Sequence, residues 1–132
     1  MKSIGIIGCG RIAQVRHIPE YADHRDARLD AFYDLNPERA RELAGTYAGR
    51  VYETYEELLE YEKIDAVSIC VPNEFHAKIS IAALKAGKDV LCEKPMAVTL
   101  EECRQMAEAA EKTGQCLMIG PVSYTHLRAH ET

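Results

Sequence analysis

The sequence predicts an α/β fold built on a doubly wound, parallel sheet of six strands. Apolar runs of strand length alternate along the chain with amphipathic helical patterns, as they do where helical crossovers join parallel strands. The first run, residues 3–7, carries isoleucines at both even and odd positions, so both of its faces are apolar. Strands of that kind lie between helices on both sides of a sheet. Right-handed crossovers then favour the doubly wound arrangement.

Local signals place the individual elements. Strands are expected at residues 3–7, 28–33, 50–52, 66–71, 89–92 and 116–119. Helices are expected between them, at about 11–21, 37–44, 54–61, 74–86 and 99–113. Asn36 before Pro37 indicates a helix start, as does the capping-box spacing at 54–57 and at 99–102. Gly87 and Gly114 indicate helix ends.

Two of these helices carry more detailed expectations. Pro19 is expected to bend or end the first helix, because proline lacks the backbone N–H that a helix interior needs. The last helix is expected to bury a face made of Leu100, Cys103, Met106, Ala107 and Ala110. The tyrosines at 47, 52, 55 and 61 are expected to pack or to lie at edges, without forming a stacking platform.

Composition limits the function. The chain has 132 residues, 47% of them hydrophobic and 28% charged, which suits one soluble globular domain. The net charge is −5 and there is no basic run, so neither nucleic acid nor an anionic membrane is an expected partner. The five cysteines form no C-x-x-C pair, and no metal site is expected. Unpaired thiols and a start too short and broken for a signal peptide or membrane span predict a cytoplasmic protein.

A dinucleotide fingerprint of the G-x-G-x-x-A form follows the first strand. Gly8 permits a tight turn, Gly10 lets the backbone approach a pyrophosphate, and Ala13 lets the helix pack closely on the strand. The helix start at Arg11 and Ile12 then presents free backbone amides to the anion. An α/β domain with a plain glycine turn and no cofactor is the alternative. The strand before the motif and the helix after it favour cofactor binding.

An acidic residue completes the fingerprint. Asp34 ends the second strand at about the spacing of 20 residues expected for a carboxylate that binds the adenosine ribose. A carboxylate accepts from the 2′ and 3′ hydroxyls and repels a 2′-phosphate, so NAD is expected rather than NADP. Arg39 in the next helix is in reach of such a phosphate, but we expect it to be a solvated helix charge.

Further polar residues stand at strand ends, where open α/β sheets bind ligands: Pro72, Asn73 and His76 after the fourth strand, and Glu93 and Lys94 after the fifth. With the Gly-Cys-Gly-Arg-Ile-Ala start, the Pro-Asn-x-x-His string, Ala-Gly-Lys-Asp-Val-Leu-Cys-Glu-Lys-Pro at 86–95 and Gln-Cys-Leu-Met-Ile-Gly at 115–120, residues 1–120 resemble the Gfo/Idh/MocA family. This family includes glucose–fructose oxidoreductase, inositol dehydrogenase and rhizopine-catabolism proteins.

The resemblance implies roles for the strand-end residues. Lys94 would lie beside the nicotinamide as the catalytic group that exchanges a proton with the reacting hydroxyl or carbonyl, and desolvation beside a cationic ring would lower the pKa of its amine. The alternative for Lys94 is a solvated surface lysine. Glu93 and Asn73 would lie along the nicotinamide and its ribose. His76 would lie near that pocket or cap its helix, and His17 matches a family histidine with a structural role.

The resemblance stops at residue 120. The family continues into a second α/β domain, whereas residues 121–132 do not resemble that continuation and are expected to be a non-native tail. His126 and His130 in that tail supply only two ligands, too few for a metal site. The parent is expected to be an NAD(P)-dependent oxidoreductase of a sugar, cyclitol or related polyol, forming homo-oligomers through the second domain. The chain alone is expected to bind cofactor and to be inactive.

Two other functions remain open from the sequence. A dinucleotide-sensing module without chemistry would share the glycine turn and the acid but would not need Lys94 at the nicotinamide end. Another two-domain NAD(P)-dependent reductase would share the cofactor fold and differ in its second half.

Overall fold

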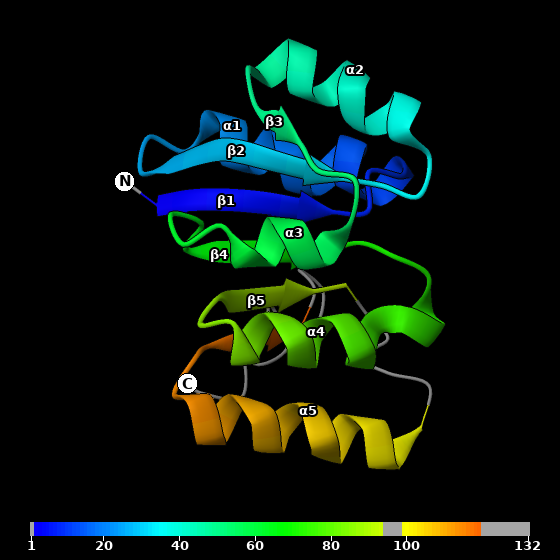
Figure 1. Cartoon of the computed structure of the whole chain (residues 1–132), viewed down its shortest axis with the longest axis vertical. Coiled ribbons are helices and arrows are strands. Elements are labelled where there is room, and N and C mark those ends of the chain that lie inside the picture. The colour runs from blue at the N-terminus through cyan, green and yellow to red at the C-terminus, as the bar shows by residue number, and fades with distance from the viewer. Residues whose placement is uncertain (1, 94–98, 120–132) are drawn as a thin grey trace, which may run out of the picture.

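A computed structural model describes residues 2–93 and 99–119 and confirms the predicted α/β fold. The sheet has the strand order β3-β2-β1-β4-β5-β6, and every pair of neighbouring strands is parallel (Figure 1). Its strands are β1 (Lys2–Ile7), β2 (Ala27–Tyr33), β3 (Arg50–Val51), β4 (Ala66–Ile69), β5 (Asp89–Cys92) and β6 (Leu117–Ile119). Each lies within two residues of the range expected from the sequence.

Strand order creates a crevice at one edge of the sheet. From the central β1 the chain winds outward to β2 and β3, then returns to β4 on the other side of β1 and winds outward to β6. The connections after β1 and β4 therefore leave toward opposite faces of the sheet. In doubly wound folds a crevice opens at this switch point, beyond the carboxyl ends of the strands, and ligands bind there.

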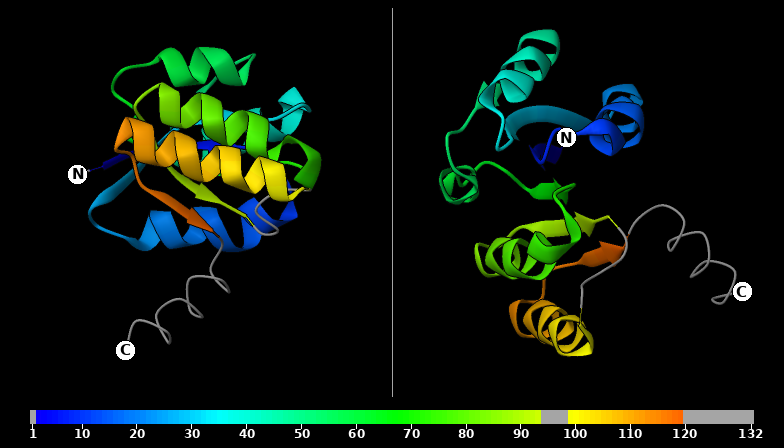
Figure 2. Two further views of the ribbon diagram at one scale, coloured as in Figure 1. Left: turned by 90° about the horizontal axis from the view of Figure 1, so that it is seen from below. Right: turned by 90° about the vertical axis from the view of Figure 1, so that its right-hand side faces the viewer.

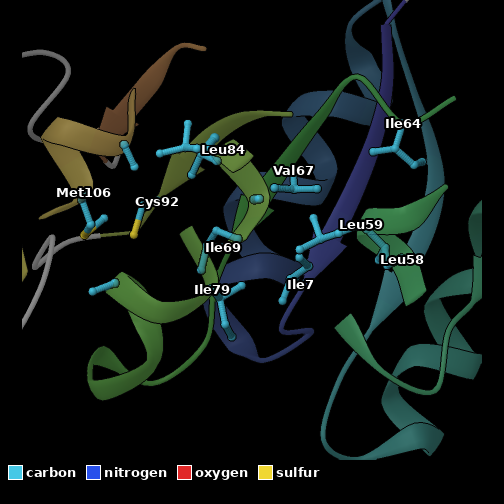
Figure 3. Packing of buried hydrophobic residues seen from close by; sticks show 14 of the residues in the cluster. Ile7, Leu58, Leu59, Ile64, Val67, Ile69, Ile79, Leu84, Cys92 and Met106 are labelled. Atoms are coloured by element: carbon cyan, nitrogen blue, oxygen red, sulfur yellow. The ribbon is translucent and has the colours of Figure 1, made fainter. Parts of the chain in front are cut away.

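Helices cover both faces of the sheet, as Figure 2 shows. On one side, the helical segment η1 (Ala13–His17), α1 (Ile18–Asp23) and α2 (Pro37–Tyr47) pack on β1 and β2. On the other side lie α3 (Tyr55–Glu60), α4 (His76–Lys85) and α5 (Leu100–Thr113), with a short 3-10 segment η2 (Asn73–Phe75) before α4. The core of that second side gathers Ile7, Ile69, Leu84 and Met106 (Figure 3).

Side-chain contacts confirm the predicted helix starts at Asn36 and Thr99, whereas α2 ends at Tyr47, three residues beyond the expected range. The Asn36 side chain accepts a 3.1 Å hydrogen bond from the backbone N–H of Glu38. The Thr99 hydroxyl accepts from the Glu102 N–H at 3.1 Å, while the Glu102 carboxylate accepts from the Thr99 N–H at 3.2 Å, which completes the capping box. Gly114 closes α5 with a φ of 73°, the left-handed conformation that glycine adopts at helix ends.

The first helix differs from the expectation at Pro19. Helical structure continues past the proline to Asp23, and the segment before it, Ala13–His17, is a π-helix. The backbone N–H of Ile18 donates to the carbonyl of Ala13, five residues earlier. Pro19 thus stands in the first turn of α1, a position where a helix tolerates a residue without an N–H.

The expectation for the buried face of α5 was wrong at two positions. Met106 and Ala109 are buried, but Leu100 is 87% exposed and Ala107 is also exposed. The helix lies at the edge of the sheet with α4 as its neighbouring helix, so only a narrow stripe of its surface is covered (Figure 1). Apolar spacing alone predicted a wider stripe than this position in the fold can bury.

Candidate dinucleotide site

The glycine turn after β1 presses against the end of β4. Gly8 has a φ of +96°, and a Cβ atom on it would lie 2.6 Å from the carbonyl carbon and oxygen of Cys70. No side chain fits there. The Gly8 N–H donates to the carbonyl of Tyr33 at 2.8 Å, which joins the turn to the end of β2 as well.

Gly10 is glycine for a different reason. A Cβ atom on Gly10 would have no heavy atom of the protein within 4 Å, so it would project into open space. Gly10 lines a cleft of about 390 Å³ at the carboxyl ends of β1, β2 and β4. The lining is formed by Gly8, Gly10, Tyr33, Asp34, Leu35, Arg39, Cys70, Val71 and Pro72. The absence of a side chain at Gly10 keeps the backbone accessible from this cleft.

Asp34 reaches from the end of β2 to the glycine turn. Its Oδ1 accepts from the backbone N–H of Cys9 at 2.7 Å, and its Oδ2 accepts from the N–H of Asn36 at 2.8 Å. A carboxylate has about four acceptor positions, so these two bonds leave acceptor capacity on both oxygens for ligand hydroxyls. The sequence predicted Asp34 as a ribose ligand but not its bond to the turn.

Arg39 lines the same cleft as Asp34, from the first turns of α2. Its side chain is exposed, as expected of a solvated helix charge. The structure therefore places a cation and a carboxylate in the lining of the same cleft.

An apolar pocket of about 130 Å³ adjoins the cleft and shares part of its wall. Its lining is Tyr33, Leu35, Tyr55, Val71, Pro72, Phe75, Lys78 and Ile79. The Tyr33 and Tyr55 rings meet edge to face, with centroids 6.1 Å apart. Sequence reasoning missed Leu35 and Phe75. Leu35 had a usable signal, because a leucine that directly follows a strand-end acid and precedes a helix cap is badly placed for the core, and it is 78% exposed.

The residues that begin the first helix divide between core and solvent. Ala13 is fully buried in the cluster between the helix and the sheet, which is the close packing its small side chain was predicted to allow. Arg11 and Ile12 are exposed at the helix start. The Gln14 side chain donates to the carbonyl of Cys9 at 2.8 Å and so braces the turn from inside the helix.

The structure places His76 behind the cleft wall. His76 is 1% exposed, and its Nε2 lies 2.8 Å from the carbonyl oxygen of Val71. Its ring thus ties the start of α4 to a residue that lines the cleft, in line with the packing alternative raised by the sequence. The side chain of Asn73 lies outside what the structure describes.

A polar network lies beside β4 and β5, in the second half of the sheet. Glu93 follows β5, and its Oε1 lies 2.8 Å from Nε2 of His17. Nδ1 of His17 lies 3.2 Å from Oγ of Ser68, which lies 2.6 Å from the hydroxyl of Tyr21. Burial, and after it the nearby charge of Glu93, raises the pKa of the Cys70 thiol. Lys94, the predicted catalytic residue, lies outside the described residues.

Within residues 2–93 and 99–119, no group of three or more His, Cys, Asp or Glu side chains is arranged to hold a metal ion. No helix in the same ranges is long and apolar enough to cross a membrane.

Residues 2–121 match the sequence profile of the oxidoreductase family with an NAD-binding Rossmann fold that carries the name GFO_IDH_MocA. The chain belongs to this family. As the family's NAD(P)-binding Rossmann domain, it has the order 3-2-1-4-5-6 seen in its sheet. The resemblance drawn from the four motifs is therefore confirmed.

Three relatives illustrate the similarity, at 31–38% identity. The chain is 38% identical over 115 residues to D-glucoside 3-dehydrogenase of Escherichia coli, matching 86% of this chain and 33% of that protein. It is 36% identical over 116 residues to inositol 2-dehydrogenase of Rhizobium meliloti, matching 88% and 34%. The crystal structure of KijD10, a 3-ketoreductase from Actinomadura kijaniata in complex with NADP and TDP-benzene, is similar with a TM-score of 0.86, 31% identity, and coverage of 90% and 37%.

The chain thus spans about a third of the length of the curated relatives it matches.

Proposed function

We propose that this domain binds NAD(H) across the crevice and serves an oxidoreductase that transfers a hydride between the nicotinamide and a sugar, cyclitol or related polyol. The observation that carries the cofactor part is the cleft in which the open side of Gly10 and the carboxylate of Asp34 meet. The substrate class is supported by the glucoside and inositol dehydrogenases among the relatives.

The residues present fit a dinucleotide. A pyrophosphate at Gly10 would meet the amides of the helix start, because Gly10 has no side chain to keep it away. The ribose hydroxyls would donate to Asp34. The adenine would enter the apolar pocket beside Leu35, Tyr55 and Phe75, since an aromatic base is stabilised by apolar walls. Pro72 lines both the cleft and that pocket and would lie along the cofactor.

We propose NAD as the preferred cofactor over NADP. The Asp34 carboxylate lines the cleft, and if it binds the ribose hydroxyls it would repel a 2′-phosphate there, which would favour the unphosphorylated ribose. Arg39 on the same wall offsets part of that repulsion. KijD10, a relative with the same fold, was crystallised with NADP, so the fold can also hold the phosphorylated dinucleotide.

We propose proton exchange as the task of Lys94. The nicotinamide, when bound, supplies the hydride acceptor or donor. Oxidation of an alcohol also releases a proton from its oxygen, and a lysine whose pKa is lowered by desolvation can take it. Asn73 and Glu93 would flank the nicotinamide and its ribose. His76, whose ring contacts the carbonyl of Val71, would help to hold that cleft residue in place. Positioning the substrate and excluding water are assigned to a second domain, so this chain alone is expected to show no turnover.

We also propose a domain boundary, a location and a mode of assembly for the protein. Residues 1–120 would form the domain and 121–132, outside the described residues, would be a non-native tail; the family match to residues 2–121 supports the boundary. A cytoplasmic location is supported by five free cysteines. Homo-oligomers would form through the second domain.

The test is a titration of NADH fluorescence with the purified chain, with circular dichroism to verify folding. We expect saturable binding that NAD⁺ and ADP-ribose both compete away. A folded chain with no affinity for either NAD(H) or NADP(H) overturns the proposal.

A further inference from the structure

His17 connects the two mononucleotide-binding halves of the fold. It is the last residue of η1, in the helix that follows β1 in the first half, whereas its partner Glu93 follows β5 in the second half. The two residues are 76 positions apart in the sequence. The π-turn that ends at His17 shifts the helical register there, and such turns occur frequently at functional sites.

With Glu93 ionised and the His17 ring neutral, one arrangement of hydrogens satisfies every contact of this network. A carboxylate only accepts, so the 2.8 Å contact with Glu93 requires a hydrogen on Nε2 of His17. In the neutral ring Nδ1 then accepts from the Ser68 hydroxyl, and Ser68 in turn accepts from the hydroxyl of Tyr21. Each of the four groups has a partner, and each donates its hydrogen to the next one until the series ends at the Glu93 carboxylate.

Because the network is largely buried, it would destabilise the fold if any of its polar groups lacked a hydrogen bond. His17 is 1% exposed and Ser68 is fully buried, and buried polar groups are destabilising unless they are hydrogen-bonded. The Glu93 side chain is 15% exposed, so the hydrogen-bond network extends from the interior toward the surface. The backbone N–H of Glu93 donates to the carbonyl of Ile69 at 3.1 Å, and Cys70, which directly follows Ile69, lines the cleft. The anionic end of the network therefore lies at the crevice.

We propose that His17 is a positioning residue that holds the Glu93 carboxylate at the nicotinamide end of the crevice and thereby favours oxidised over reduced dinucleotide. This inference rests on the proposed function. With the adenosine at Asp34 in the first half, the nicotinamide lies over the second half, where β4 and β5 end. The ring is cationic when oxidised and neutral when reduced, so a fixed carboxylate beside it stabilises NAD⁺ more than NADH.

The experiment compares three ligands, NAD⁺, NADH and ADP-ribose, in calorimetric titrations of the whole chain. ADP-ribose has no nicotinamide and reports on the first half alone. For Glu93→Gln we expect the ratio of NAD⁺ to NADH affinity to fall about fivefold, a size consistent with one partly solvated charge near the ring. ADP-ribose affinity should stay within twofold. For His17→Gln we expect a change in the same direction and of smaller size, because the carboxylate stays but is no longer held.

Two further variants keep the test decisive. Tyr21→Phe removes only the far hydroxyl of the network, and it serves if His17→Gln does not fold; we expect a smaller fall in the same ratio. His24→Gln alters an exposed histidine outside the network, whose Nδ1 accepts from the Asp26 N–H, and should leave all three affinities unchanged. In the wild type, ¹⁵N spectra of the His17 ring should show a hydrogen on Nε2, and Glu93→Gln should move that signal.

The outcomes separate the two claims. If the wild type binds none of the three ligands, the proposed function fails. If the wild type binds all three, and the Glu93 and His17 variants either leave the NAD⁺ to NADH ratio unchanged or weaken ADP-ribose by the same factor, the network is structural and this inference is overturned.

Discussion

The Oδ1 atom of Asp34 accepts a 2.7 Å hydrogen bond from the backbone N–H of Cys9, the middle residue of the glycine turn. The two halves of the dinucleotide fingerprint are therefore in direct contact. The acid predicted to bind a ribose also helps to hold the turn that would receive the pyrophosphate. A change at Asp34 should therefore affect both the ribose contact and the glycine turn.

Replacing Asp34 should change the choice of cofactor. Asp34→Asn keeps an oxygen that can accept from Cys9 and removes the negative charge. We expect NADH to bind at least about tenfold more weakly, since a charged hydrogen-bond acceptor is lost, while NADPH loses less or gains. Fluorescence titration with both nucleotides measures the ratio.

Asp34→Ala is the matched comparison for that experiment. It removes both bonds to backbone amides, and we expect it to lower the free energy of unfolding by about 1–3 kcal/mol as well. Equal NADH binding by the wild type, Asp34→Asn and Asp34→Ala would show that Asp34 does not contact the ribose.

Gly10→Ala should weaken binding without weakening the fold. The added Cβ meets no protein atom within 4 Å, so the free energy of unfolding should stay within about 0.5 kcal/mol of wild type. The same Cβ would stand in the cleft where a pyrophosphate approaches, and NADH affinity should fall at least about tenfold by fluorescence titration.

Two other glycines are controls for Gly10→Ala. Gly45 lies inside α2, and a Cβ atom on it would meet no heavy atom of the protein within 4 Å. Gly45→Ala should therefore stabilise the protein by about 0.5–1 kcal/mol and leave NADH binding unchanged. In Gly8→Ala the added Cβ would lie 2.6 Å from the Cys70 backbone, and residue 8 has a positive φ that alanine disfavours. This variant should be severely destabilised. Normal NADH affinity in Gly10→Ala would count against a pyrophosphate at this turn.

Thr99→Ala should destabilise the start of α5. It removes the side chain that accepts from the Glu102 N–H and breaks the capping box. We expect a loss of about 1 kcal/mol in urea unfolding with an unchanged m value. Thr46→Ala, at an exposed position inside α2, should change stability by less than about 0.5 kcal/mol. Equal effects of the two substitutions would contradict the cap.

The five thiols should react in two groups. Cys116 is exposed and Cys103 is half-buried, so both should react with a disulfide reagent at pH 8, Cys116 first. Burial, with the charge of Asp34 adding to it, raises the pKa of Cys9 to about 12, and burial raises the pKa of Cys92 to about 11. Cys9 and Cys92 should react only after unfolding, and the half-buried Cys70, whose pKa is raised by burial, should react more slowly than Cys103. Rapid labelling of Cys9 in the folded chain would contradict its placement.

Stability should fall as the pH rises above about 9. In the folded state burial raises the pKa of the Cys92 thiol to about 11, whereas the unfolded thiol ionises at its ordinary pKa of 9.0. Between these values the folded state binds more protons, so each pH unit costs stability, by at most about 1.4 kcal/mol for one group. Urea titrations from pH 8 to 10.5 should show a smaller decline for Cys92→Ala; identical slopes would contradict the raised pKa.

Local signals were sufficient for the strands, the helix caps and the fingerprint. Alternating apolar runs placed each strand within two residues, and Asn36 and Thr99 cap helices as their positions indicated. Such signals are reliable because they act between residues a few positions apart. They failed where the surroundings of an element mattered: Leu100 is exposed because α5 is an edge helix, and helical structure continues past Pro19.

The order of amino acids was enough to infer a dinucleotide fold and to name Gly8, Gly10 and Asp34, because a turn, a helix start and a strand end each have a local pattern. The contacts of Asp34 with Cys9 and of His17 with Glu93, and the apolar pocket at Leu35, became known from the folded chain. They depend on which strands are neighbours and on how each helix lies across the sheet. Those relationships are set by packing between distant segments, which no local pattern encodes.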